Sequence, residues 1–369
     1  SYNNGITTDT YKVGGEWAPY EDLRFRGSFQ RAVRAANIIE LFASQGAGLF
    51  DMAFDPCDDI GDDALNNNSI PASCIGANPW QVTVGESDSG LLGSPAGQYN
   101  GLFGGNPNLT PEVSDTTTLG FVFAPQFLPG FNVSLDWFHI EVSNLVATTG
   151  AQNTLNDCYV NLNAASCARI TRDPSLGSLW VAGGEVEDLN TNIGGIETTG
   201  VDINANYSVD VGSMGSLGFQ LVGTWLDELI TDPGQGITPY DCAGNYGQVC
   251  GTPNPEWRHR FRVSWETPWS FDVDATWRYY GSVDQVNGAG TPIAAGDLDS
   301  SFDAISYFDV SGSWDVLDNT SLRFGVNNVL DTDPPLSNNV GAGSGNGNTY
   351  PQVYEALGRY VFAGFTVDF

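Results

Sequence analysis

Along most of the chain, apolar and polar residues alternate in segments of about ten residues. Alternation with a period of two places successive side chains on opposite faces of a β-strand. The segments that carry this pattern predict eleven strands: 7–18, 21–33, 112–124, 130–142, 193–208, 216–229, 255–267, 270–281, 302–315, 319–330 and 353–369. We find no heptad and no repeat of solenoid length. The chain is therefore predicted to be all-β.

The connections between these strands alternate strictly between short and long. Short turns are expected at 19–22, 125–130, 210–215, 267–270 and 316–319. Long loops are expected at 34–111, 143–192, 230–254, 282–301 and 331–352. Antiparallel outer-membrane barrels have this arrangement, with short periplasmic turns and long extracellular loops. A secreted soluble β-protein is the alternative, but it has no reason to place every long loop on one side.

The two faces of the predicted strands suit a membrane. In 255–267 the apolar face begins at Trp257 and ends at Trp265. Eight tilted residues span roughly 20 Å, so the two indoles would lie near the two aromatic girdles of a barrel. His259 interrupts this face near the rim. In 130–142 the apolar set shifts after Trp137, which predicts a β-bulge or a strand that extends above the bilayer.

The composition limits the classes of partner that the protein can have. The 44 acidic and 13 basic residues give a formal net charge of −31, which excludes a nucleic-acid partner that needs a basic surface. Charged residues make up only 15% of the chain, which suits a protein with one face in lipid. No apolar run is long enough for a transmembrane helix. No secretory signal opens the sequence, so we expect that it was removed or that the gene product starts earlier.

The six cysteines form three local pairs inside predicted loops. We expect disulfides Cys57–Cys74, Cys158–Cys167 and Cys242–Cys250, because an even count in close pairs indicates an oxidising compartment. The alternative is free or metal-binding thiols. No CxxC motif and no neighbouring histidine supports a metal site.

Several segments, in order, resemble motifs of the barrel of TonB-dependent outer-membrane receptors. Residues 26–42 resemble R-x-S-x-x-x-A-x-R-A-P-N-I-x-E-L-F, with Ala36 in place of the proline. Residues 109–120, 134–142, 324–335 and 357–369 resemble the motifs L-x-P-E…T-x-G, S-x-D-x-x-x-I-x-I and G-x-x-N-L-F-D…P and the last strand of that family. The first long loop resembles the branch linked to oligosaccharide uptake in proteobacteria.

This resemblance implies the C-terminal half of a 22-stranded transmembrane β-barrel in the bacterial outer membrane. It also implies partners: the N-terminal half of the barrel, a plug of about 150 residues, the TonB complex and outer-membrane lipid. We find no plug among the 369 residues. The expected function is TonB-dependent active uptake of a scarce nutrient, with an oligosaccharide favoured and a ferric chelate next. The alternative is a non-transporting surface or assembly component built from a receptor-like half barrel.

The number of strands carries a prediction of its own. If the last strand runs down to the periplasm, counting back through the connections makes the first strand run down as well. A closed bacterial barrel normally has an even number of strands. An open sheet of eleven would leave unpaired backbone groups in lipid, at several kcal/mol each. We therefore expect strands 7–18 and 353–369 each to pair with a missing half, in a separate chain or elsewhere in the same polypeptide.

Charged residues on the inward face of one hairpin predict an ionic ladder in the lumen. The ladder consists of Arg258, Arg260, Arg262, Asp272 and Asp274. It would hold the plug or line a substrate path; the alternative is a wall that only pairs its own charges. Further arginines on the same face are Arg24, Arg26, Arg278 and Arg323.

The first long loop is acidic and rich in aromatic residues. Residues 35–168 contain no lysine or arginine but 14 acids. A weak calcium site is expected from Asp55, Asp58, Asp59, Asp62 and Asp63, with a solvated acidic loop as the alternative. Ligand-binding aromatics, suited to a sugar, are expected at Phe50, Phe54, Trp80, Tyr99 and Phe103. Internal packing of the loop is the alternative for these rings.

Catalysis has little support in the sequence. The two histidines, His139 and His259, lie on predicted strands, and no Gly-x-Ser-x-Gly motif is present. The glycine-rich stretch 341–347 lacks the strand and helix of a phosphate loop. We therefore expect no enzyme and no cofactor, and rank a secreted β-rich enzyme last.

Overall fold

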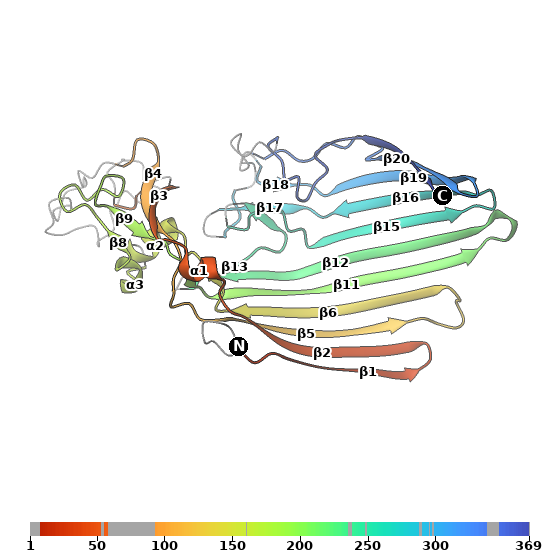
Figure 1. The fold of residues 1–369 in the computed structure, drawn as a ribbon, viewed down its shortest axis with the longest axis horizontal. Helices are drawn as coiled ribbons and strands as arrows, with labels where there is room; N and C mark the ends of the chain where they lie inside the picture. Colours follow the sequence, from red (N-terminus) through yellow and green to blue (C-terminus); the bar gives the residue numbers. More distant parts are fainter. Residues whose placement is uncertain are drawn as a thin grey trace.

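The structure is a computed structural model that describes residues 8–52, 55–57, 93–159, 161–234, 238–247, 249–287, 290–294, 296, 299–337 and 347–368. Eleven long strands form one antiparallel sheet in which neighbours along the chain are neighbours in space (Figure 1). They are β1 (Tyr11–Tyr20), β2 (Leu23–Arg34), β5 (Glu112–Phe123), β6 (Phe131–Ser143), β11 (Gly195–Asp210), β12 (Ser216–Asp232), β15 (Trp257–Glu266), β16 (Phe271–Tyr280), β19 (Ile305–Leu317), β20 (Thr320–Asn327) and β21 (Tyr360–Val367). A two-residue strand, β13 (Tyr240–Asp241), adds to β12.

Each long strand overlaps a segment that the alternation predicts, with two clear differences. The last strand is β21 and begins at Tyr360, whereas 353–359 is turn and coil. Val353 and Tyr354 are β-branched and aromatic, as strand residues often are, but they pack in a cluster of loop residues instead. The strand expected at 302–315 starts at Ile305, because Phe302 belongs to a separate short strand, β18 (Ser301–Phe302).

The sheet is open in the structure. β1 pairs only with β2 and β21 pairs only with β20 among the described strands, so the first and last strands do not meet. Short turns gather at one end of the sheet, and the long loops lie at the other end (Figure 1). The edge strands β1 and β21 are the two strands that the odd strand count predicts to lack a partner.

The apolar face of β6 changes sides along the strand. No bulge occurs at Trp137, because the pairing of β6 with β5 and β11 runs without a shift through this residue. Beyond Trp137 the face that carries this indole continues with His139 and Glu141, and the opposite face becomes apolar at Phe138 and Ile140. Water beyond the bilayer favours a polar outer surface, so the strand extends above the membrane. The predicted bulge is wrong; a register shift occurs instead between β11 and β12, at Thr199/Gly200.

The lipid-facing side carries large exposed apolar side chains. Trp17, Phe365 and Trp314 are exposed by 66%, 75% and 46%. Rings stack across strands on this face, as Trp277 does on Phe308 with centroids 6.1 Å apart. Such a continuous apolar band is unfavourable in water and favourable in lipid. None of the helices in the described part of the chain is long and apolar enough to cross a membrane.

Beyond the long-loop end of the sheet, two loops fold together into a small unit with its own core. We call it the loop unit. It contains a sheet of β3 (Gly46–Asp51), β4 (Gln98–Phe103), β9 (Glu185–Glu187) and β8 (Ile170–Thr171), and the helices α2 (Ala151–Tyr159) and α3 (Ala164–Cys167). Leu155, Leu179 and Val186 are fully buried in its core. The two loops thus behave as one packed body rather than as separate segments.

The other long loops pack in an aromatic cluster near β16 and β19. It includes β14 (Asn245–Gly247), β17 (Val283–Val286) and β18, which form a three-stranded sheet. Tyr246 stacks on Phe302 with centroids 4.3 Å apart, and Tyr350 and Tyr354 contact Phe302 edge-on. The remaining elements are α1 (Ile38–Phe42), the pair β7 (Val146–Ala147) and β10 (Thr191–Asn192), and the 3₁₀ turn Gly212–Met214.

Candidate lumen-wall site

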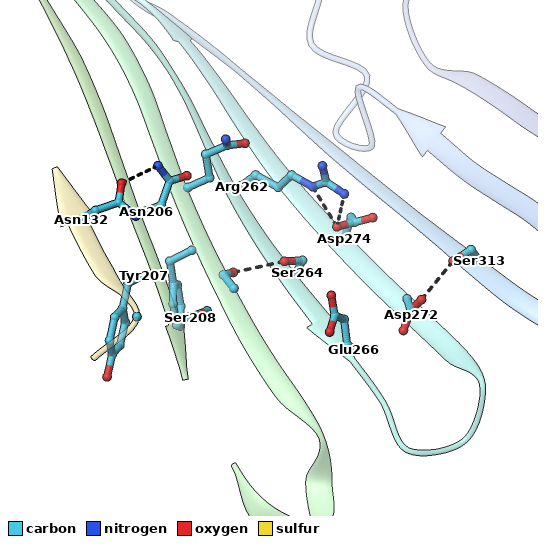
Figure 2. A pocket seen from close by; sticks show the side chains of 14 residues that line it. Asn132, Asn206, Tyr207, Ser208, Arg262, Ser264, Glu266, Asp272, Asp274 and Ser313 are labelled. Atoms are coloured by element: carbon cyan, nitrogen blue, oxygen red, sulfur yellow. Dashed lines mark hydrogen bonds and ion pairs between the residues drawn. The ribbon is translucent and has the colours of Figure 1, made fainter. Parts of the chain in front are cut away.

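The polar face of the sheet holds a hollow near its short-turn end. The hollow has a volume of about 530 Å³ and takes side chains from β6, β11, β12, β15, β16 and β19. Figure 2 shows polar groups lining it, among them Asn132, Asn206, Arg262, Glu266 and Asp272. These residues are brought together by register, because every second residue of neighbouring strands faces the same side. The lumen wall is thus a hydrogen-bonding surface.

Only one rung of the predicted ionic ladder forms. Arg262 donates from Nε to Asp274 Oδ1 over 2.8 Å (Figure 2). Asp272 faces Glu266 across the hairpin and accepts a hydrogen bond from Ser313. Arg258 and Arg260 have no acidic side chain within 4.0 Å in the described part of the chain. The prediction of a full ladder is wrong because the register sets Arg260 opposite Arg278 and Arg258 opposite Tyr280.

Other lumen arginines find acids that the sequence reading did not pair. Arg26 on β2 donates to Asp136 on β6 over 2.7 Å, across the intervening Gly120 of β5. Arg278 binds Asp309 at 2.8 Å and Glu355 at 3.4 Å. For the pair of Arg26 and Asp136, the available signal was Gly120, which has no side chain and lies between them in the same row across the strands. The second pair involves a loop carboxylate, which no strand pattern could place.

Further charged lumen residues are less tightly held. Arg24 lies 3.5 Å from Glu16, and both side chains are more than half exposed. Arg323 is exposed and has no salt bridge among the described residues. A second hollow of about 240 Å³ is lined by Thr224, Arg258, Arg260, Arg278 and Tyr280 among others.

The described loop aromatics pack inside the loop unit. Tyr99 is only 2% exposed and stacks on Phe50, with centroids 6.0 Å apart. The Phe103 ring lies against Gly48 and Gly101 of the same sheet. The structure therefore favours internal packing, the alternative to ligand binding, for Tyr99, Phe50 and Phe103. Phe54 and Trp80 lie outside the described residues.

Asp55, the first carboxylate of the predicted calcium site, is engaged by an arginine. The Asp55 carboxylate and the Arg172 guanidinium form a bidentate pair at 2.7 Å, with side chains 1% and 5% exposed. Burial alone lowers the pKa of Arg172, but the hydrogen bonds to Asp55 outweigh it and raise the pKa. Asp58, Asp59, Asp62 and Asp63 lie outside the described residues. Within the described residues no group of acids, histidines or cysteines could hold a metal ion.

Two of the three expected disulfides are present in the described residues. Cys158 is bonded to Cys167 between α2 and α3, and Cys242 is bonded to Cys250. Cys57 is also disulfide-bonded, and Cys74 lies outside the described residues. Both described bonds lie at the long-loop end, where the sequence predicts them.

Sequence reasoning missed the residues that hold the loop unit together. Arg172 joins the first long loop to the second, and it also donates to the Tyr159 hydroxyl at 2.8 Å and the Gly177 carbonyl at 2.9 Å. Asp188, 5% exposed, accepts the Gly150 N–H at 3.0 Å, and burial raises the pKa of its carboxyl. Arg169 and Arg172 are the first basic residues after a long acidic stretch, and that was the signal available.

Comparison with known proteins agrees with this geometry. The family model described as TonB dependent receptor-like, beta-barrel matches residues 1–329. Among solved structures, a variant of the ferric enterobactin receptor of Pseudomonas aeruginosa, in complex with enterobactin, is similar at 14% identity and a TM-score of 0.58. The siderophore receptor PirA of Acinetobacter baumannii is similar at 15% identity and a TM-score of 0.57. Among curated protein sequences, none matches.

These structures are longer than the chain. The alignments cover 97% and 98% of this chain, but 40% and 41% of the two receptors. At such identities the likeness describes the fold. The eleven-stranded open sheet therefore corresponds to part of a larger receptor barrel.

Proposed function

Because the chain belongs to the TonB-dependent receptor-like β-barrel family, we propose that it forms the C-terminal half of the barrel of an active-transport receptor. The receptor takes up a scarce nutrient across the bacterial outer membrane. One observation carries the proposal: an open antiparallel sheet with an apolar lipid-facing side, a polar lumen side and all long loops at one end. Such a wall encloses a transport path once its edges are paired.

The directions of the two edge strands determine which strands can complete the barrel. β1 and β21 run in the same direction, because ten successive antiparallel steps separate them. A second copy of the sheet, inserted in the same orientation, would meet these edges with parallel strands and break the antiparallel pattern. An N-terminal half that starts and ends with strands of the opposite direction fits both edges. We propose that half, a plug and the TonB complex as the partners.

We propose a neutral oligosaccharide as the substrate, with a ferric chelate as the rival. The support comes from the lumen wall, since three of the five loop aromatics are packing residues. Beside its charged groups, the 530 Å³ hollow is lined by the amides and hydroxyls of Asn132, Asn206, Gln220 and Ser264. Amides and hydroxyls donate and accept in the way that sugar hydroxyls require. Neither loop arginine of the loop unit is available for an anion, because Arg172 is buried and Arg169 lies beside Asp188.

The test is uptake in the native bacterium. Deletion of the gene for the intact receptor should abolish uptake of its nutrient from a panel of labelled oligosaccharides and iron-loaded chelators, and deletion of TonB should do the same. Loss of an iron chelate alone would overturn the oligosaccharide assignment. Uptake that is unchanged by both deletions would overturn the transport function and favour a surface or assembly component.

A pair of variants tests whether the hollow takes part. Gln220→Ala removes an exposed amide from its lining, and Gln30→Ala removes an amide from the same face of β2, outside the hollow. We expect a several-fold higher half-saturating concentration for uptake in the first variant only, because one lost hydrogen bond costs about 1 kcal/mol. Equal uptake in both variants would exclude the hollow from the substrate path.

A further inference from the structure

The sheet of the loop unit has one edge strand that is long and unprotected. The strand order is β3, β4, β9, β8, so β3 and β8 are the two edges among the described strands. β8 is only two residues long and lies between Arg169 and Arg172. β3 has six residues, contains no proline and no basic residue, and is charged only at its last residue, Asp51. Because short length, proline and charge are the usual protection of an edge strand, β3 is open to pairing with a further strand.

The register of β3 with β4 shows which backbone groups lie on this edge. Leu49 is the cross-strand partner of Asn100, but the Asn100 N–H is donated to the Leu179 carbonyl over 2.9 Å rather than to Leu49. The two residues therefore form a pair without mutual hydrogen bonds, in which the backbone N–H and C=O groups point away from the neighbouring strand. By the same alternation, the N–H and C=O groups of Ala47, Leu49 and Asp51 lie on the outer edge of β3. No hydrogen bond from another described residue reaches these groups.

Large apolar side chains accompany this edge. Leu49 is 61% exposed and lies on the face opposite Phe50, whose ring packs inward on Tyr99. The helix α1 precedes β3 in the chain and exposes two further kinds of apolar side chain, the isoleucines and the phenylalanine of Ile38, Ile39 and Phe42. Figure 1 shows α1 at the long-loop end of the barrel strands and β3 farther out, so these side chains lie beyond the lipid-facing band. Exposed apolar side chains in such a group are typical of a protein interface.

The exposed helix is held firmly from its other side. Asn37 and Glu40 form a reciprocal capping box at its N-terminus. The Glu40 carboxylate also binds Arg34 at 3.0 Å, and the Glu40 carbonyl accepts the Asn106 N–H at 2.8 Å. Leu41 is buried beneath the helix. A partner thus meets a surface that is already ordered, which lowers the entropic cost of binding.

Charge indicates which kind of protein fits this surface. The two loops that build the unit, 35–111 and 143–192, contain 14 acidic and two basic residues. Both basic residues are engaged inside the unit, because Arg172 is buried against Asp55 and Arg169 lies beside Asp188. A second copy of the chain would bring the same negative charge and be repelled. A segment rich in lysine or arginine would be attracted.

We propose that β3 is a docking edge for a cationic protein segment in extended conformation. The segment adds a strand to the sheet of the loop unit, bonds to the backbone of Ala47, Leu49 and Asp51, and packs its apolar side chains on Leu49 and α1. In this mode of recognition main-chain hydrogen bonds supply affinity, and side chains and charge select the partner. The contact goes beyond the transport function, since it lies outside the lumen and does not depend on the nutrient.

Binding of a model peptide to the intact receptor tests the edge. The receptor is held in phosphatidylcholine nanodiscs, whose lipid has no net charge, and the probe is a fluorescent peptide of alternating Lys and Val. We expect this peptide to bind at least about tenfold more tightly than a peptide of alternating Glu and Val. Hydrogen exchange should show new protection in β3 and none in β8. Absence of binding, equal binding of the two peptides, protection elsewhere alone, or a β3 edge that is already protected in the free receptor would overturn the proposal.

Variants of β3 test backbone pairing and charge separately. Ala47→Pro removes an N–H from the outer edge, where proline is tolerated, and the control Ala47→Ser keeps it. We expect affinity for the Lys–Val peptide to fall about fivefold in Ala47→Pro only, because one hydrogen bond is lost. Leu49→Lys should weaken binding about tenfold by repulsion, whereas Leu176→Lys, at an exposed leucine outside β3, should change it less than about twofold.

Exchange of β4 amides shows whether the sheet persists in each variant. Unchanged affinity in Leu49→Lys, or equal affinity of Ala47→Pro and Ala47→Ser with an intact β4, would overturn the proposal. Crosslinks between the position-49 side chains of two receptors would assign the edge to a second copy and overturn it as well. Uptake of the nutrient should be normal in all four variants, so a failure of this inference leaves the proposed function untouched.

Discussion

Replacing Arg172 by methionine should loosen the loop unit while leaving the barrel intact. Arg172 makes two hydrogen bonds of 2.7 Å to Asp55 and further bonds to Tyr159 and Gly177, and its ring contact with Tyr159 has a distance of 5.0 Å. In Arg172→Met the Asp55 carboxylate stays buried and loses its charged partner, while the hydrogen bond from the Cys57 N–H remains. Removing one partner of a buried pair costs about 3–5 kcal/mol.

The magnitude can be separated into its parts with a double-mutant cycle. Asp55→Asn keeps the oxygen that accepts from Cys57 but removes the charge, and leaves Arg172 buried beside a neutral amide. The combined variant leaves no unpaired charge. We therefore expect it to be less destabilised than the sum of the single variants, with a coupling free energy of about 2–3 kcal/mol.

Native-state hydrogen exchange measures this on the intact receptor. The opening free energy of amides in β3, β4 and β9 should fall by about 3–5 kcal/mol in Arg172→Met. Amides in β12 and β15 should be unchanged, and they serve as the internal control. A loss below about 1 kcal/mol, the range of an exposed ion pair, would refute the reasoning that burial makes this pair strong.

Three further changes have defined outcomes. Replacing Cys158 and Cys167 with alanine should lower the opening free energy of the loop unit by about 2–3 kcal/mol, because the bond closes a loop of nine residues, and equal exchange in both proteins would contradict this. Burial raises the pKa of Asp188 above its ordinary 3.8, so the folded unit binds this proton more tightly and loses stability as pH rises through that range. Asp188→Asn should remove this pH dependence and keep the acceptor for Gly150, and an unchanged pH profile of exchange would show the assignment wrong. Gly120→Ala should destabilise the barrel to denaturant by about 1–3 kcal/mol, since its Cβ would lie 2.1 Å from Asp136 Oδ1, whereas Gly46→Ala, whose Cβ would have no atom within 4 Å, is the neutral control.

The sheet could be predicted from the sequence because its rule is local. Alternation with a period of two follows from one face in lipid and one in the lumen, so even single residues such as Trp257 and Arg262 are assigned to the correct face. The point along a strand at which the bilayer ends was harder to infer. The change of faces after Trp137 indicated either a bulge or a strand above the bilayer, and only the register with β5 and β11 distinguishes them.

The candidate site was less predictable because it depends on register and on loops. The register of the hairpin sets Arg260 opposite Arg278 and six residues along β16 from Asp272, so two charges on the same face do not by that alone come into contact. Tyr99 is an aromatic residue of the kind that binds sugars, yet it lies in the core of the loop unit. That unit is assembled from two loops that are far apart in the sequence. Pairs such as Asp55 and Arg172, 117 residues apart, have no local signal.

The most direct test of the account is the structure of the intact receptor in a lipid nanodisc, determined by cryo-electron microscopy. We predict that β1 and β21 each pair in antiparallel fashion with a strand from the rest of the receptor, so that this sheet forms one half of the wall of a single large barrel. Hydrogen bonds between β1 and β21, closing these strands into a small barrel, would contradict it.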